Sequence, residues 1–124
     1  MFSVRYFVDD VEKSVEFYSE KLGFKVDQQF PAMAIVSKNG LTLWLSGPLS
    51  SAARPMPDGS TPSPGGWNRF ALHVDDIEAT VKTLRSAGVK FRNDIIQGPG
   101  GQQTLCEDPS GNVIELFQPA QHQS

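Results

Sequence analysis

The chain has few of the residues that build disulfides and metal clusters. Its 124 residues include one cysteine, Cys106, and two histidines, His73 and His122. A single cysteine excludes an internal disulfide and a cysteine cluster around a metal. Cys106 falls in a segment with the pattern of a strand, so a small apolar strand residue is favoured over a reactive thiol.

The sequence also lacks an excess of positive charge and long apolar runs. A net charge of -3 and a pI near 5.2 give no basic surface, so nucleic acid and anionic membranes are not expected as partners. No apolar run approaches the ~20 residues that cross a bilayer, and no signal-peptide pattern follows Met1. We therefore expect a cytoplasmic protein. Its length and 39% apolar content predict a single globular domain, residues 1–124.

What the chain does contain is an internal repeat. The segment Phe7-Val8-Asp9-Asp10-Val11-Glu12 returns in the second half as His73-Val74-Asp75-Asp76-Ile77-Glu78. Asp10 and Asp76 stand where the N-cap of a helix is expected. Apolar residues then follow with the spacing of one buried helical face. These residues are Val11, Val15, Tyr18 and Leu22 in the first copy, and Ile77, Val81 and Leu84 in the second. Each copy therefore predicts an amphipathic helix, and Gly23 and Gly88 are expected to end the two helices.

One strand precedes each expected helix and three follow it. Period-two alternation places strands near residues 3–8, 24–30, 33–37 and 41–46, and again near 68–74, 89–93, 102–107 and 113–118. Lys38-Asn39-Gly40 and the segment 108–112 have the composition of turns. The chain is thus expected to contain a first βαβββ module (1–46), a Gly/Pro/Ser-rich connecting loop (47–67), a second βαβββ module (68–119) and a frayed tail (120–124). The loop is either a plain linker or a functional lid.

Two tandem βαβββ modules with these motifs resemble the vicinal oxygen chelate superfamily, which includes glyoxalase I, extradiol dioxygenases and the fosfomycin and bleomycin resistance proteins. The resemblance rests on Val8-Asp9-Asp10, Leu22-Gly23-Phe24 and Asp108-Pro109-Ser110-Gly111-Asn112. It implies an α+β fold in which the two modules form a curved mixed sheet around a central pocket. It also implies a homodimer, with modules that pair either within one chain or across the subunits.

The metalloenzymes of this superfamily hold a divalent ion with side chains from the first and last strand of each module. Counting back from the helix-capping aspartates puts Ser3 and Arg69 at the first-strand positions. Glu115 matches the last-strand carboxylate position of the second module, and alignment of Gly40 with Gly111 puts Trp44 at the equivalent position of the first. Arginine has no free lone pair and a serine hydroxyl is a weak ligand, so Glu115 is the one family-matching ligand. His73 is not a substitute, because it lies roughly 13 Å along the strand from Arg69. We therefore expect neither a divalent metal nor any other cofactor.

Alternation along the strands also predicts which side chains line a small-molecule pocket. The expected ligand-binding residues are Arg5, Phe7, Trp44, Arg69, His73, Glu115 and Phe117. Arg69 and Glu115 could form a bidentate ion pair that serves as a structural clasp. Alternatively Arg69, with Arg5, receives an oxygen of a carboxylate, phenolate or enolate while Glu115 orients the ligand.

The favoured hypothesis is a glyoxalase/bleomycin resistance-like protein that binds a small aromatic or amphipathic molecule in a metal-free pocket, without a reaction. The alternatives are a metal-dependent lyase or dioxygenase of the glyoxalase type, or a metal-free acid–base enzyme that uses Glu115 and Arg69. The catalytic residues of such an enzyme are unknown, with Glu115, Arg69 and His73 as candidates.

Overall fold

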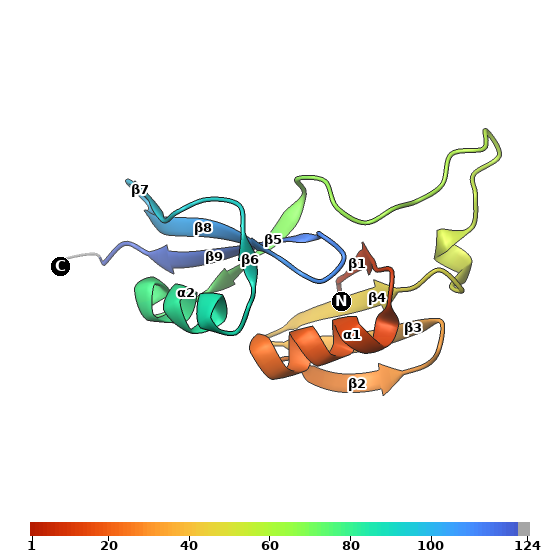
Figure 1. Ribbon diagram of the computed structural model, residues 1–124, viewed down its shortest axis with the longest axis horizontal. Coiled ribbons are helices and arrows are strands. Elements are labelled where there is room, and N and C mark those ends of the chain that lie inside the picture. Colours follow the sequence, from red (N-terminus) through yellow and green to blue (C-terminus); the bar gives the residue numbers. More distant parts are fainter. Residues whose placement is uncertain (122–124) are drawn as a thin grey trace. The chain divides into compact units, whose positions relative to one another are not determined.

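The computed structural model describes residues 1–121, so His122 and most of the expected tail lie outside the described residues. The chain forms two compact units, and each consists of a mixed sheet with a helix on one face (Figure 1). The first unit comprises Met1–Gly66 and Pro109–Asn112, and the second comprises Trp67–Asp108 and residues 113–121. The expectation of two βαβββ modules is confirmed.

The first unit contains a four-stranded sheet in the order β1-β4-β3-β2. Its elements are β1 (Ser3–Phe7), α1 (Val11–Glu16), the π-helical turn η1 (Phe17–Lys21), β2 (Lys25–Gln29), β3 (Met33–Lys38) and β4 (Leu41–Ser46). Strand β1 pairs with β4 in parallel, and the other pairs are antiparallel. The sheet is therefore mixed, as expected.

Local sequence signals explain the limits of these elements. The Asp10 carboxylate accepts a hydrogen bond from the Lys13 backbone N–H, which caps the first helix as expected. Asn39 and Gly40 have positive φ angles of 48° and 88° and form the two-residue turn between β3 and β4. Gly23, at φ 75°, follows the helical segment.

The core of the first unit lies between α1 and the sheet. The apolar residues that the helical spacing selected are all buried. They pack beneath alternate residues of the strands, which are Tyr6, Val8, Ala34, Val36, Leu43 and Leu45. Because successive strand residues point to opposite faces, the residues between them lie on the open face of the sheet. This alternation is what positions the candidate site residues of the first unit.

The second unit repeats this arrangement. Its elements are β5 (Arg69–His73), α2 (Ile77–Ser86), β6 (Lys90–Phe91), β7 (Ile96–Gly98), β8 (Gly101–Glu107) and β9 (Val113–Pro119). The sheet has the order β5-β9-β8-β6, with β7 paired to β8. The Asp76 carboxylate caps α2 through the Ala79 N–H, as expected. Ile77, Val81 and Leu84 face the core.

Two strands differ from the sequence prediction. The strand expected at residues 89–93 is reduced to β6, because Asn93 turns its side chain toward β8, where it accepts hydrogen bonds from Thr104 and the Leu105 N–H. The short strand β7 was not predicted. It forms a hairpin with β8 in which Gly98 pairs with Gly101.

The connecting loop is irregular apart from the 3₁₀ turn η2 (Ser51–Ala53). Its end is held by Asn112, whose side-chain oxygen accepts a hydrogen bond from the Gly65 N–H. The Asn112 side-chain amide donates to the Phe7 carbonyl at the end of β1. The turn at Pro109–Asn112 thus packs with the first unit, although it joins two strands of the second.

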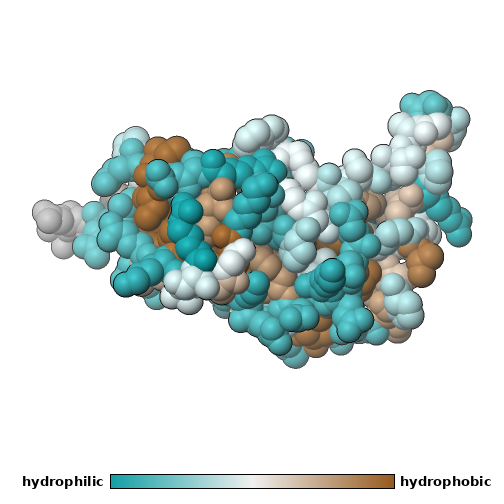
Figure 2. Space-filling model, viewed as in Figure 1, coloured by the Kyte–Doolittle hydropathy of each residue, from teal (hydrophilic) through white to brown (hydrophobic). Residues whose placement is uncertain are grey.

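The surface carries several exposed apolar side chains. In Figure 2 the visible face is mostly hydrophilic, with apolar residues in separate patches. Phe2, Leu49 and Trp67 are among the exposed large apolar residues. No helix in the described part of the chain is long and apolar enough to span a membrane.

Candidate functional site

The expected ligand-binding residues fall on the open faces of the two sheets, and each face is described within its own unit. Arg5, Phe7 and Trp44 lie on the face of the first sheet that α1 does not cover. On the second sheet, the corresponding residues come from β5 and β9, which pair in parallel. They are Arg69, His73, Glu115 and Phe117.

The expected ion pair between Arg69 and Glu115 is present. The Arg69 Nε donates to Glu115 Oε1 at 3.1 Å, and Nη2 lies 3.0 Å from the same oxygen. Nη1 donates to the Trp67 carbonyl at 3.4 Å. The geometry differs from the expected bidentate fork, because the two nitrogens share one carboxylate oxygen. All three guanidinium nitrogens of Arg69 therefore have partners on its own unit.

His73 lies at the end of β5, away from this ion pair. Its imidazole contacts the Phe117 ring, with the two ring centroids 5.4 Å apart and tilted by 55°. His73 is directly opposite Phe117 in the strand register, whereas Glu115 is opposite Ala71. His73 is exposed, so the pair offers an aromatic contact surface at this end of the sheet.

Arg5 has different surroundings from Arg69. Its guanidinium carbon lies 4.8 Å from the ring centroid of Trp44, directly opposite it on β4. Nη1 donates to the hydroxyl of Ser46, a buried side chain, at 3.2 Å. The arginine thus lies over an indole in a cation–π contact and donates a hydrogen bond to a neutral hydroxyl.

Some residues of the open faces were missed by the sequence prediction. Ile35 lies opposite Trp44, and Met33 lies opposite Ser46, so both extend the open face of the first sheet. The two-residue turn at Asn39-Gly40 could have revealed this register, because it fixes the pairing of β3 with β4. Val113 lies opposite Arg69, on the same face of β9 as Glu115, and is completely buried.

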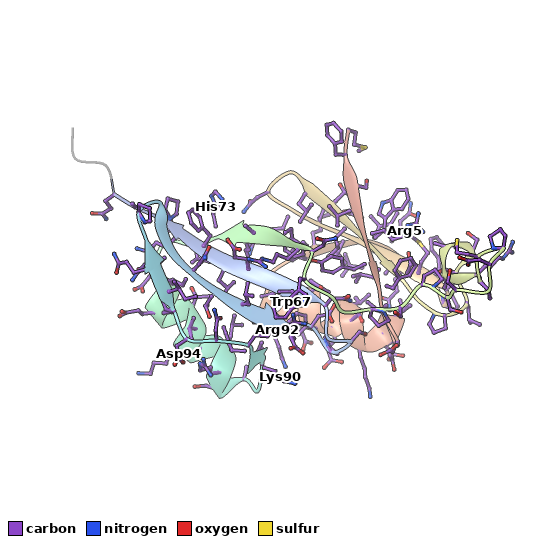
Figure 3. All side chains as sticks on the ribbon, turned by 90° about the horizontal axis from the view of Figure 1, so that it is seen from above. Arg5, Trp67, His73, Lys90, Arg92 and Asp94 are labelled. Carbon is purple, nitrogen blue, oxygen red and sulfur yellow. The ribbon has the colours of Figure 1, made fainter. Side chains whose placement is uncertain are left out.

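A second stacked arginine was also missed. The Arg92 guanidinium carbon lies 4.5 Å from the Trp67 ring centroid. The two labelled residues lie near one another in Figure 3. Its Nε donates to Glu107 Oε2 at 2.9 Å. Alternation along one strand could not predict this contact, because Trp67 precedes β5 and Arg92 follows β6. Trp67 therefore packs beside the sheet of its own unit, with its ring largely exposed.

Cys106 has no features of a reactive thiol. It lies on β8 with no exposed surface. Burial raises the pKa of the thiol to about 12, with a smaller contribution from the Asp108 carboxylate. The thiol is thus neutral at physiological pH, in agreement with its interpretation as a small apolar strand residue.

A surface cavity of about 610 Å³ lies on the first unit, beside the start of α1. Its lining comes from the first helical turn and from the connection between β2 and β3. The lining residues are Asp10, Val11, Glu12, Gln29, Phe30 and Pro31. None of the expected ligand-binding residues lines this cavity. Its walls include two carboxylates, and one of them, Asp10, already caps α1.

The donor set does not fit the metal centre of the family's metalloenzymes. Glu115, the one matching carboxylate, already accepts two contacts from Arg69. Trp44 and Arg69 have no lone pair to offer a metal, and Ser3 has only a hydroxyl. Within residues 1–121, no three side chains of His, Cys, Asp or Glu gather where they could hold an ion.

The architecture and the aligned motifs match one protein family. The model of the Glyoxalase/Bleomycin resistance protein/Dioxygenase superfamily matches residues 1–116. The chain belongs to this superfamily. The expected resemblance is thereby confirmed, while no curated protein sequence matches the chain.

Several solved structures of superfamily members are similar to this protein. TnmS3, an antibiotic binding protein from Streptomyces sp. CB03234, is 29% identical, with 97% of each chain covered and a TM-score of 0.67. A superfamily member from Sphaerobacter thermophilus is 27% identical, with 95% of this chain and 97% of that chain covered and a TM-score of 0.71. Lactoylglutathione lyase from Agrobacterium tumefaciens shares the fold at 17% identity, with 95% and 92% covered and a TM-score of 0.73.

Proposed function

We propose that this superfamily member binds a small, flat aromatic or amphipathic molecule without a metal ion. The observation that carries the proposal is the Arg69–Glu115 ion pair. The one carboxylate at a family ligand position is occupied by a permanent cation, with the Glu115 side chain 14% exposed and that of Arg69 31% exposed. A metal at this position would have to displace the guanidinium.

The chemistry of the open faces supports a binding role. Trp44 and Ile35 on the first sheet, and His73 and Phe117 on the second, are aromatic or apolar groups beside a few polar ones. Small-molecule sites commonly have this mixture. The similarity to TnmS3, an antibiotic binding protein, agrees with the same role at 29% identity. We further propose that the protein is a cytoplasmic homodimer.

A metal titration tests the metal-free part of the proposal. We expect chelator-treated protein to take up no stoichiometric Ni²⁺, Zn²⁺, Mn²⁺ or Fe²⁺ when the titration is followed by calorimetry and elemental analysis. The physical reason is that one carboxylate, already paired, falls short of the roughly three protein ligands of a catalytic metal centre. Tight uptake of one ion per chain would instead support the metal-dependent lyase or dioxygenase.

Replacement of Trp44 by alanine tests the place of binding. Planar aromatic compounds that bind the wild-type protein should bind Trp44→Ala about tenfold more weakly, because the stacking surface is lost. Calorimetry gives the affinities, and tryptophan fluorescence in a Trp67→Phe background reports on Trp44 alone. Trp67→Ala is the matched control, since Trp67 is also stacked under an arginine. Equal losses in both variants would place the ligand elsewhere.

A further inference from the structure

On the open face of the first sheet, the strands β1, β4 and β3 form a neutral platform around one cation, while Lys25 of the edge strand β2 lies opposite Ser37. Three residues cross the sheet in one row, since Arg5 is opposite Trp44 and Trp44 is opposite Ile35. In the next row, Phe7 is opposite Ser46, which is opposite Met33. Ser3, Thr42 and Ser37 form the row on the other side. None of these nine residues except Arg5 carries a formal charge.

The charge of Arg5 is not neutralised by a carboxylate. In the part of the chain that the structure describes, Arg5 takes part in no ion pair. Its contacts are the Trp44 ring and the Ser46 hydroxyl. By contrast, Arg69 is paired with Glu115, and Arg92 is paired with Glu107. Within residues 1–121, three arginines contact a tryptophan residue, and Arg5 is the one whose charge is not balanced by a carboxylate partner.

The guanidinium of Arg5 also keeps donors for a ligand. An arginine side chain has five N–H groups in a planar fork, and the Ser46 hydroxyl accepts one of these donors from Nη1. Ser46 is 1% exposed, so this hydrogen bond holds the guanidinium in place from the side of the buried hydroxyl. The remaining N–H groups are available on an exposed residue beside an apolar surface. Such a cation is weakly hydrated and matches the geometry of a carboxylate.

We infer that the ligand of this protein is an anionic aromatic molecule whose acidic oxygen is received by Arg5. The inference rests on the proposed binding function and names the ligand class and the residue that selects it. The aromatic part packs on the platform beside Trp44, and the carboxylate or phenolate oxygen accepts hydrogen bonds from the Arg5 fork. A cationic aromatic molecule is rejected by repulsion from the same guanidinium.

The test compares three probes that share one ring system and differ in charge. They are 2-naphthoate, 2-naphthamide and 2-naphthylmethylammonium, and calorimetry measures their affinities for the full-length protein. We expect the wild-type protein to bind the carboxylate about tenfold more tightly than the amide, because the hydrogen bonds become charge-assisted. The cation should bind more weakly than the amide. In Arg5→Gln the carboxylate and the amide should bind equally.

Arg92→Gln is the matched control, because Arg92 is also stacked on a tryptophan but is paired with a carboxylate. It should keep the wild-type preference for the carboxylate. If the preference persists in Arg5→Gln, or if the wild-type protein prefers the amide or the cation, the inference about Arg5 is overturned while the binding function stands. If none of the three probes nor any other planar aromatic compound binds, the proposed function fails as well. Circular dichroism establishes that each variant is folded.

Discussion

Replacement of Tyr18 by alanine is expected to lower the free energy of unfolding by about 3–5 kcal/mol. Tyr18 has no exposed surface and lies at the centre of three aromatic rings. The ring centroids of Phe17 and Phe24 are 5.1 Å and 5.5 Å from its own, both in edge-to-face geometry. Alanine would leave a cavity between the helical segment and β2 and would remove both aromatic contacts.

Urea denaturation followed by circular dichroism measures this loss. The control is Phe30→Ala, because Phe30 is an aromatic residue of the same unit with 52% of its surface exposed. It should cost much less, since little apolar area is buried there. Similar losses in the two variants would show that the aromatic cluster does not stabilise the unit. A typical domain has a free energy of unfolding of about 5–15 kcal/mol, and the expected loss is a large part of it. Tyr18→Ala is therefore also expected to unfold at a markedly lower temperature.

Gly101→Ala is expected to destabilise the protein by about 2–4 kcal/mol. Gly101 begins β8 with a φ angle of +145°, which residues with a side chain rarely adopt. A Cβ atom there would lie 2.1 Å from the Gln118 carbonyl oxygen and 3.0 Å from the Ala120 nitrogen. Both are backbone atoms, so the strand pair β8–β9 would have to separate. The Gln118 side chain also accepts a hydrogen bond from the Ile77 N–H at the start of α2.

The neighbouring glycine supplies the control for this prediction. A Cβ atom on Gly100 would meet nothing within 4 Å. Gly100→Ala should therefore be close to neutral in the same thermal and urea denaturation experiments. If the Gly101→Ala variant were as stable as Gly100→Ala, this would contradict the close approach of Gly101 to the Gln118 carbonyl.

The parts of the fold that depend on local sequence were predictable. The N-caps Asp10 and Asp76, the Asn39-Gly40 turn and the buried helical faces each follow from a pattern a few residues long. Strand β7 was missed because Ile96-Gln97-Gly98 is too short to show alternation, and its pairing with β8 is what holds it extended. The π-helical turn was missed because it brings the neighbouring residues Phe17 and Tyr18 both into the core, against the 3.6-residue spacing.

The candidate residues were predictable to the extent that strand alternation fixes them. It placed Arg5 and Trp44 on one open face, whereas the expected pairing of Arg69 with Glu115 came from the family resemblance. It could not show that all three guanidinium nitrogens of Arg69 would have partners within its own unit. One partner, the Trp67 carbonyl, belongs to the connection before β5 rather than to a strand. Nor could it show that Arg5 would be left with a neutral partner. Whether a charged side chain meets an opposite charge depends on contacts between strands that are far apart in the sequence.

The Asn112 contacts have a consequence for how the two halves of this chain can be separated. A protein fragment that stopped at residue 66 would carry every strand of the first sheet, yet it would lack the amide that holds the Phe7 carbonyl and the Gly65 N–H. Ser110, whose hydroxyl accepts from the Asp9 N–H, would be missing too. The first unit is therefore completed by four residues, Pro109–Asn112, from the second half of the chain, so a fragment of residues 1–66 would lack part of its own unit.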